Sequence, residues 1–256
     1  MKIGISQLDI VFEDKEATKT RCMSIAQEAA NEGVRLLVFP EMTLTGFTMQ
    51  PQKQGDGKDD IVFFQKISHT YHMAIAFGYI SRGENGGYEN RMAIVEEERI
   101  LLDYAKIHPF SYSGEHLVYQ PGGKVAHVEY GNHHLAANIC YDLRFPEIFS
   151  ALRQTVDTYI VIANWPKQRI TQWEALLRAR AIENQAYVVG VNRCGEGDGL
   201  CYPCSSCVYN WLGEEISRPV SAQLLVAELD KEAVLAARSA FPQEADRRNA
   251  LYKSLL

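Results

Sequence analysis

Short apolar runs that alternate with helix-like segments constrain the fold of this chain more than any other feature of its sequence. Runs of roughly four to eight apolar residues, bounded by glycine, proline or charged residues, are typical of buried strands. Helices that recur between such strands, together with hairpins, indicate a mixed β-sheet with helices on its outer side, and hence the α/β class. The predicted strands are 2–9, 36–39, 74–80, 89–96, 99–106, 135–139, 159–164, 187–192, 208–214 and 222–228, and the predicted helices are 16–32, 59–71, 148–152 and 171–185.

Three reactive side chains stand at or near the ends of three of these predicted strands. Cys140 follows the apolar run LAANI and opens a polar turn, Glu41 follows RLLVFP, and Lys106 ends ILLDYAK. Strand ends that meet along one edge of an open sheet form the usual ligand site of such folds. A carboxylate base, a cation and a thiol nucleophile are the groups that an amide-cleaving thiol enzyme requires. Taken singly, Cys140 could be a buried structural cysteine, Glu41 a helix-start residue and Lys106 a solvated charge.

Length and composition favour one large domain. A chain of 256 residues with 46% hydrophobic content can bury one substantial core, so residues 1–256 are predicted to form a single domain with a C-terminal arm from about residue 237. The net charge of −6 argues against non-specific binding of nucleic acid. No segment approaches the length that spans a membrane, and the start MKIGISQLDI has neither the basic region nor the cleavage site of a signal peptide. We therefore expect a cytoplasmic protein.

Four of the six cysteines crowd into the segment CGEGDGLCYPCSSC, as Cys194, Cys201, Cys204 and Cys207. Such a cluster could hold zinc, organise an interaction module around that metal, or form disulfides. Cys204 and Cys207, however, fall in a predicted alternating strand, CSSCVYNW, in which side chains three positions apart face opposite sides of the sheet. We therefore interpret these cysteines as small packing residues rather than as a metal site, with oxidation in air as a practical risk.

The segments around the reactive residues resemble a known enzyme signature. FPEMTLTGF, AKIHPF and ICYDLRFPE occur in the order of the Glu–Lys–Cys motifs of the nitrilase superfamily of carbon–nitrogen hydrolases. The resemblance begins at MKIGISQLDI, continues through IVIANWPKQR, LLRARAIENQAYVVGVNRCGEGDG and WLGEEI, and therefore covers nearly the whole chain. Within the superfamily, GEHLVYQPG and ANWPKQRITQWEALLRARAIENQ look most like the ω-amidases, which hydrolyse the terminal amide of 2-oxoglutaramate and 2-oxosuccinamate.

This resemblance implies a four-layer α-β-β-α sandwich, in which two mixed sheets pack face to face with helices outside. It also implies a homodimer, because nitrilase-like sandwiches typically pair through a helical layer, and the C-terminal arm ARSAFPQEADRRNALYKSLL could cross to the partner copy. No cofactor or metal is expected, since every group in the implied chemistry belongs to the protein. The alternatives are another amidase, an N-carbamoyl hydrolase or a nitrilase of the same superfamily acting on a small aliphatic substrate, and a non-catalytic binding protein that retains the sandwich.

The implied reaction is hydrolysis of a small-molecule amide through a thioester. Glu41 would take the proton of Cys140 as the thiol attacks the amide carbon, because an ordinary thiol is mostly protonated at neutral pH. Lys106 and the backbone N–H of Tyr141 would stabilise the oxyanion. The family also has a second glutamate, and Glu115, on the loop after the Lys106 strand, is our candidate for the anion that keeps Lys106 charged. Its alternative role is that of a solvated loop charge.

An ω-amidase substrate carries a carboxylate at the end opposite its amide, and a cation is the usual partner for such a group. The candidate substrate-binding residues are the cations Arg144, Lys167 and Arg169, and the aromatic pocket walls Phe47 and Trp165. Arg144 could instead pair with Glu147 and brace the turn after the nucleophile. For the two aromatic residues, ordinary packing is the alternative role.

Other charged residues receive simpler interpretations. His108 and His116 would permit a Cys–His mechanism, but the Glu–Lys pair explains the chemistry without them, so both are interpreted as loop residues. Arg178, Arg180 and Glu183 lie within about two turns of one predicted helix, and such spacing favours an ion-pair network.

Overall fold

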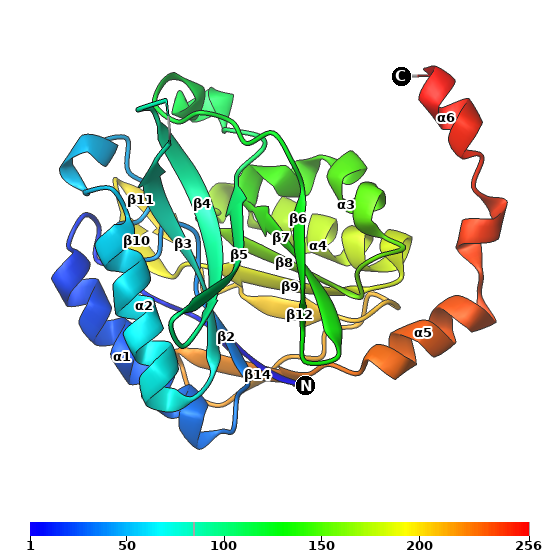
Figure 1. The fold of residues 1–256 in the computed structure, drawn as a ribbon, viewed down its shortest axis with the longest axis horizontal. Coiled ribbons are helices and arrows are strands. Elements are labelled where there is room, and N and C mark those ends of the chain that lie inside the picture. Colours follow the sequence, from blue (N-terminus) through cyan, green and yellow to red (C-terminus); the bar gives the residue numbers. More distant parts are fainter. Residues whose placement is uncertain (84, 256) are drawn as a thin grey trace.

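Two β-sheets pack face to face between outer layers of helices in the computed structural model, which describes residues 1–83 and 85–255 (Figure 1). Helices α1 (Lys15–Asn31) and α2 (Lys58–Tyr71) cover the larger sheet, and α3 (Pro146–Leu152) and α4 (Ile170–Asn184) cover the smaller one. The predicted four-layer α-β-β-α sandwich is therefore confirmed. None of the helices in the described part of the chain is both long and apolar enough to cross a membrane.

The larger sheet has seven strands, with parallel pairing at its centre and antiparallel pairing towards its edges. From edge to edge they are β13 (Arg218–Pro219), β14 (Leu224–Glu228), β1 (Lys2–Ser6), β2 (Leu36–Val38), β3 (Ala74–Arg82), β4 (Tyr88–Glu96) and β5 (Arg99–Ala105). Strands β1, β2 and β3 are parallel because α1 and α2 supply the crossovers between them. Strands β3, β4 and β5 follow one another antiparallel, as short connections allow.

The smaller sheet has five strands and the same mixed character. Its order is β12 (Cys207–Tyr209), β9 (Tyr187–Asn192), β8 (Thr158–Ala163), β7 (His133–Ile139) and β6 (Ala126–Tyr130). The three central strands are parallel, and α3 and α4 connect them. A further hairpin, β10 (Gly195–Gly197) and β11 (Leu200–Tyr202), forms a small sheet of its own.

Strand β8 shows how one apolar run supplies two cores. Every residue of β8 is buried, because layers cover both faces of the smaller sheet. Ile160 and Ile162 belong to the core between the two sheets, where they join the apolar side chains of the larger sheet. Tyr159 and Val161 alternate with them and belong to the core under α3 and α4, together with Trp173. A third core fills the space between the larger sheet and its own two helices.

The strand predicted over 208–214 is shorter in the structure, because an asparagine side chain ends it. Oδ1 of Asn210 accepts hydrogen bonds from the backbone N–H groups of Leu212 at 2.9 Å and Glu214 at 3.0 Å. Gly213 has a φ of 76°, which suits a glycine in this turn. The Asn210 side chain thus binds N–H groups that a longer strand would donate to the sheet. Predicted strands 2–9 and 222–228 are also shorter, at Lys2–Ser6 and Leu224–Glu228.

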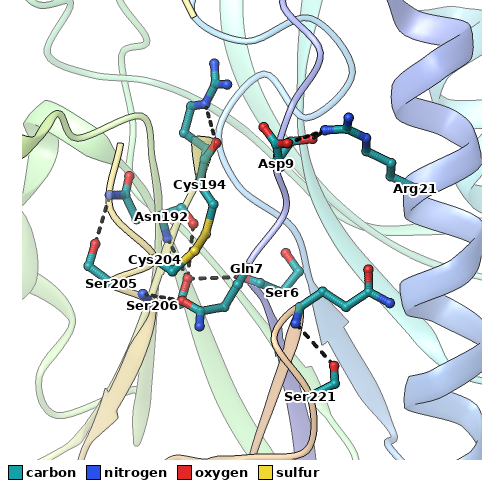
Figure 2. Close-up of a disulfide and its surroundings, with 12 residues drawn as sticks. Ser6, Gln7, Asp9, Arg21, Asn192, Cys194, Cys204, Ser205, Ser206 and Ser221 are labelled. Carbon is teal, nitrogen blue, oxygen red and sulfur yellow. Dashed lines mark hydrogen bonds and ion pairs between the residues drawn. A yellow bond between two sulfur atoms is a disulfide. The ribbon is translucent and has the colours of Figure 1, made fainter. Parts of the chain in front are cut away.

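Cys194 and Cys204 form a disulfide between the loop after β9 and the segment before β12 (Figure 2). The interpretation of these two cysteines as packing residues is therefore wrong, because the glycine-rich stretch between them folds back as the β10–β11 hairpin. The predicted strand also begins later, since β12 starts at Cys207. Cys201 is exposed and Cys207 is buried, both as free thiols. Across residues 1–83 and 85–255, no group of three or more His, Cys, Asp and Glu side chains is placed to hold a metal ion.

The C-terminal arm runs outside the α3–α4 layer and ends in a helix that projects from the body (Figure 1). It begins with α5 (Lys231–Ala240) and ends with α6 (Asn249–Leu255). Val234 of α5 is buried in the core between the sheets, Arg238 donates hydrogen bonds to backbone carbonyls of the body, and Arg153 of the body pairs with Glu244. Phe241 is 66% exposed and Leu255 is 73% exposed, so the arm presents apolar side chains to its surroundings.

Candidate active site

Residues that follow four strands converge at one end of the sandwich. Glu41 follows β2, Lys106 directly follows β5, Cys140 directly follows β7 and Asn164 directly follows β8. Strands β2 and β5 belong to the larger sheet, and β7 and β8 belong to the smaller one. A cavity of about 390 Å³ opens there, lined by Lys106, Cys140 and Asn164 among others. This volume lies within the range of small-molecule sites.

The Lys106 ammonium binds both predicted glutamates. Its Nζ donates to Oε1 of Glu41 at 2.9 Å and to Oε2 of Glu115 at 2.9 Å. All three side chains are buried, with exposed fractions of 1%, 0% and 0%. Glu115 is therefore not a solvated loop charge. Nζ also lies 3.1 Å from Oε1 of Glu115, so the ammonium contacts three carboxylate oxygens in the resting cluster.

Asn90 joins the two carboxylates from the other side. Its Nδ2 donates to Oε1 of Glu41 at 2.7 Å and to Oε1 of Glu115 at 2.9 Å. Asn90 lies inside β4 and is buried, whereas the predicted site residues lie at strand ends or on loops. Together Glu41, Lys106, Glu115 and Asn90 form a closed hydrogen-bonded cluster, which we call the base cluster.

The turn that carries Glu41 is held against β3 and β8. The backbone N–H of Asn164 donates to Oε2 of Glu41 at 2.9 Å, and Nδ2 of Asn164 donates to the Glu41 carbonyl at 2.8 Å. On the other side, a Cβ added at Gly78 would lie 2.4 Å from the backbone nitrogen of Met42. Only glycine permits this close approach of β3 to the turn. Asn164 was also absent from our predicted site, although it stands at a strand end.

Charge within the base cluster sets the protonation states. Burial alone would raise the pKa of Glu41, but the Lys106 charge and the hydrogen bonds from Lys106, Asn90 and Asn164 hold it below its ordinary value of 4.5. Burial opposes the charge of Lys106, but Glu115 and Glu41 raise its pKa well above its ordinary value of 10.5. Burial and the charge of Glu41 raise the pKa of Cys140 well above 9.0. The resting cluster therefore combines a carboxylate, an ammonium and a neutral thiol.

Cys140 occupies a strained turn directly after β7. Its backbone φ of 49° lies in the left-handed region, which residues other than glycine rarely adopt. Asp142, buried just beyond it, holds the turn by accepting hydrogen bonds from the backbone N–H of Ile139 at 3.0 Å and from the Tyr104 hydroxyl at 2.7 Å. The next residue along from Cys140, Tyr141, lines the cavity.

His108 supports this turn from outside the cavity. Its backbone N–H and its Nδ1 lie 3.0 Å and 2.8 Å from Oδ1 of Asp142, and its ring stacks on that of Phe145 with 3.8 Å between centroids. It does not belong to the cavity lining among the described residues. His116 is exposed. The geometry therefore gives neither histidine access to the reacting groups.

The predicted substrate-binding residues separate into two sets. Phe47, Trp165, Arg144 and Arg169 all line the cavity. The Arg144 guanidinium lies 5.0 Å from the Trp165 ring centroid, and the Arg169 guanidinium lies 5.2 Å from that of Phe110. Within the described residues neither arginine forms an ion pair, so both charges remain available to an anion.

Three charged residues lack one of the contacts predicted for them. Lys167 is exposed and does not line the cavity, so the structure does not favour it as a substrate anchor. Arg144 donates to Oε1 of Gln172 and, within the described residues, makes no ion pair with Glu147. The predicted network on α4 reduces to one pair, Arg180 with Glu183 at 2.9 Å. Its third member, Arg178, packs its guanidinium 5.2 Å from the Tyr209 ring instead.

Comparison with known proteins identifies the family. A family model described as carbon-nitrogen hydrolase matches residues 2–239. The chain belongs to the carbon–nitrogen hydrolase family. This carbon–nitrogen hydrolase is 34% identical over 245 residues to the omega-amidase YafV of Yersinia enterocolitica, with 94% of each chain covered. It is 28% identical over 257 residues to the 2-oxoglutaramate amidase of Bacillus subtilis, with 98% of each chain covered.

The fold of this carbon–nitrogen hydrolase also matches solved structures. The carbon-nitrogen hydrolase of Helicobacter pylori G27 matches it with a TM-score of 0.92 at 21% identity, covering 100% of this chain and 98% of that chain. The predicted membership of the carbon–nitrogen hydrolases is confirmed. The protein is therefore a hydrolase of carbon–nitrogen bonds other than peptide bonds.

Proposed function

We propose that this carbon–nitrogen hydrolase is a thiol-dependent amidase for small 2-oxo dicarboxylic acid monoamides, such as 2-oxoglutaramate and 2-oxosuccinamate. The products would be the 2-oxo acid and ammonia. The observation that carries the proposal is Cys140 beside the base cluster, in a cavity whose walls present the guanidinium groups of Arg144 and Arg169, which form no ion pair within the described residues. The names of the two curated relatives, an omega-amidase and a 2-oxoglutaramate amidase, support the same substrate class.

The first half of the reaction forms a thioester. The Cys140 sulfur attacks the amide carbon while Glu41 accepts the thiol proton, and the depressed pKa of Glu41 keeps that carboxylate ready as a base. The carbonyl oxygen becomes an oxyanion, which is stabilised by the charge of the Lys106 ammonium and accepts a hydrogen bond from the backbone N–H of Tyr141. Protonated Glu41 then gives its proton to the leaving nitrogen, the C–N bond breaks, and ammonia departs.

The second half releases the acid. A water molecule loses a proton to Glu41 as its oxygen attacks the thioester carbon, and the same oxyanion donors act again. The C–S bond breaks and the proton returns from Glu41 to the Cys140 sulfur. One amide and one water thus become one carboxylic acid and one ammonia. Glu115 does not exchange protons in this scheme; its charge keeps Lys106 an ammonium throughout.

A substrate panel tests this assignment directly. At equal concentrations, we expect the wild-type protein to release ammonia from 2-oxoglutaramate faster than from glutamine, an N-carbamoyl amino acid or a nitrile. A preference for the carbamoyl compound would move the protein to the N-carbamoyl hydrolases, and a preference for glutamine would exclude a 2-oxo acid requirement.

Replacing Arg169 by alanine is expected to raise KM for 2-oxoglutaramate by roughly tenfold or more, since a charge-assisted contact is worth about 1.5–3 kcal/mol. KM for a neutral amide of the same length should change little, because that substrate has no carboxylate. Arg144→Ala is expected to behave in the same way if its stacked guanidinium binds the acid. The matched control is Lys167→Ala, a neighbouring cation outside the cavity, which should alter neither KM. Equal losses of kcat on both substrates would instead indicate damage to the Cys140 turn.

The pH dependence of kcat/KM follows from the shifted groups. Glu41 must be deprotonated to act, and its pKa lies below 4.5, while Cys140 stays neutral because its pKa lies above 9.0. We therefore expect kcat/KM for 2-oxoglutaramate to vary little between pH 4.5 and 9.0 wherever the protein remains folded. Initial rates with circular dichroism at each pH provide the measurement. An acid limb centred near pH 6 to 7 would contradict Glu41 as the base, since a carboxylate with a lowered pKa cannot produce it.

A further inference from the structure

Tyr202 stands on the cavity wall and takes no part in the reaction described above. It lies on β11, is 5% exposed, and lines the cavity with Cys140 and Asn164. Within residues 1–83 and 85–255, its hydroxyl makes no hydrogen bond to the protein. Because Tyr202 lines the cavity, a hydroxyl without a protein partner is available to a molecule bound there.

A buried arginine fixes the Tyr202 ring. The guanidinium of Arg193 lies 4.5 Å from the ring centroid and is 1% exposed. It is anchored by donating hydrogen bonds from Nη2 to the carbonyls of Ile10 at 2.8 Å and Glu196 at 2.9 Å. A Cβ at Gly197 would lie 2.7 Å from Arg193 Nη1, so the guanidinium has no room to move on that side. A stacked cation of this kind holds the ring in one orientation.

The chemistry of the hydroxyl suits an acceptor on the substrate. Burial raises the pKa of Tyr202 to about 12, so the group keeps its proton at neutral pH and acts as a donor. The charge of Arg193 acts in the opposite direction on this pKa, but burial outweighs it.

The hairpin that carries Tyr202 is closed covalently. The Cys194–Cys204 disulfide joins residues on either side of β10 and β11, ten positions apart in sequence. Next to it, Oγ of Ser206 donates to the carbonyl of Ser6 at 2.9 Å and accepts from the backbone N–H of Asn192 at 3.0 Å (Figure 2). Both ends of the hairpin are thus attached to the sandwich, and a donor held this way loses little entropy when it binds a ligand.

We propose that the Tyr202 hydroxyl binds the substrate, donating a hydrogen bond to an oxygen of its 2-oxo acid end. The amide end lies at Cys140, where Lys106 and the Tyr141 N–H already serve the carbonyl oxygen. The opposite end offers ketone and carboxylate oxygens. The protonated Tyr202 hydroxyl, whose ring stacks on the buried Arg193 guanidinium, can donate to either oxygen. This inference rests on the proposed substrate class and assigns a residue that discriminates within it.

The test compares Tyr202→Phe with wild type on three five-carbon amides. They are 2-oxoglutaramate, glutaramate, which lacks the ketone, and pentanamide, which lacks both the ketone and the carboxylate. We expect KM for 2-oxoglutaramate to rise by roughly tenfold or more with little change in kcat, and KM for pentanamide to stay unchanged. The matched control is Tyr209→Phe, since Tyr209 is also buried beneath an arginine but lies outside the cavity. Titration of 2-oxoglutaramate into Cys140→Ala, with and without Tyr202→Phe, gives the same comparison as a Kd.

The three substrates separate the outcomes. A loss on both acids assigns the hydrogen bond to the carboxylate, and a loss on 2-oxoglutaramate alone assigns it to the ketone oxygen; either supports the proposal. An equal loss on pentanamide, or no loss beyond that of Tyr209→Phe, overturns it. Wild-type turnover keeps the two hypotheses apart: a wild type that ignores both acids refutes the proposed function, whereas normal wild-type turnover with an unaffected Tyr202→Phe refutes only the role of Tyr202.

Discussion

A Cys140→Ala variant is expected to release no measurable ammonia from 2-oxoglutaramate while keeping the wild-type fold. Removing the sulfur removes the atom that forms the thioester, and loss of a catalytic nucleophile can cost on the order of 10⁴-fold or more in kcat. The left-handed backbone at this position should persist, because Asp142 and its hydrogen bonds hold the turn. Ammonia release and thermal unfolding, measured on the same preparation, provide the test.

The matched control for this variant is Cys201→Ala. Cys201 is a free, exposed cysteine that does not line the cavity, so its replacement should leave the rate unchanged. Comparable activity in Cys140→Ala and wild type would refute the thioester mechanism. If Cys140→Ala unfolds at a much lower temperature, Cys140→Ser replaces it, because serine has a similar side-chain volume but its hydroxyl is a far weaker nucleophile.

Lys106→Met is expected to be among the most destabilising single substitutions in this protein, as well as an inactivating one. Methionine fills a similar volume but leaves the buried carboxylates of Glu41 and Glu115 without a counter-charge. Breaking a buried ion pair from one side costs about 3–5 kcal/mol, because the remaining charge stays desolvated. Urea unfolding of the variant, followed by circular dichroism, measures this cost as a lower midpoint.

The control for this effect is Lys58→Met, which removes a lysine from an exposed pair with Asp56 and should change stability little. A second variant shows whether charge is the cause. Combining Lys106→Met with Glu41→Gln and Glu115→Gln removes every charge of the base cluster, and should recover much of the lost stability without any activity. A triple variant as unstable as Lys106→Met alone would show that packing, rather than unpaired charge, is what Lys106 provides.

The positions of Glu41, Lys106 and Cys140 could be predicted because each follows an apolar run, and parallel strands bring such ends to the same edge of the fold. Asn90 gave no such signal. It lies inside β4 opposite Ile80, and a polar residue in an alternating strand is ordinarily expected to face solvent. Its burial depends on Glu41, 49 positions away in sequence, and on Glu115. Such contacts between residues far apart in sequence can be recognised only once the three-dimensional positions of Glu41 and Glu115 are known.

The sequence also did not show which side chains line the cavity. Arg169 and Lys167 are two positions apart and equivalent as sequence, yet one lines the cavity and the other is exposed, because residues two positions apart in a 3-10 helix point in different directions. Tyr202 and the cysteine pair depended on a hairpin that local propensity did not predict. Its strands are three residues each, too short for a periodic pattern to form.

The Cys194–Cys204 bond has a practical consequence for work on this enzyme. Thiol enzymes are usually handled in dithiothreitol so that the nucleophile stays reduced, and here the same reagent also acts on the covalent ring that encloses the hairpin. Samples with and without reductant therefore differ in two respects: the oxidation state of Cys140 and the stiffness of the wall that carries Tyr202. A Cys194→Ser, Cys204→Ser double variant cannot form the disulfide, so its hairpin is the same with and without reductant. In this variant the oxidation of Cys140 can be followed by itself.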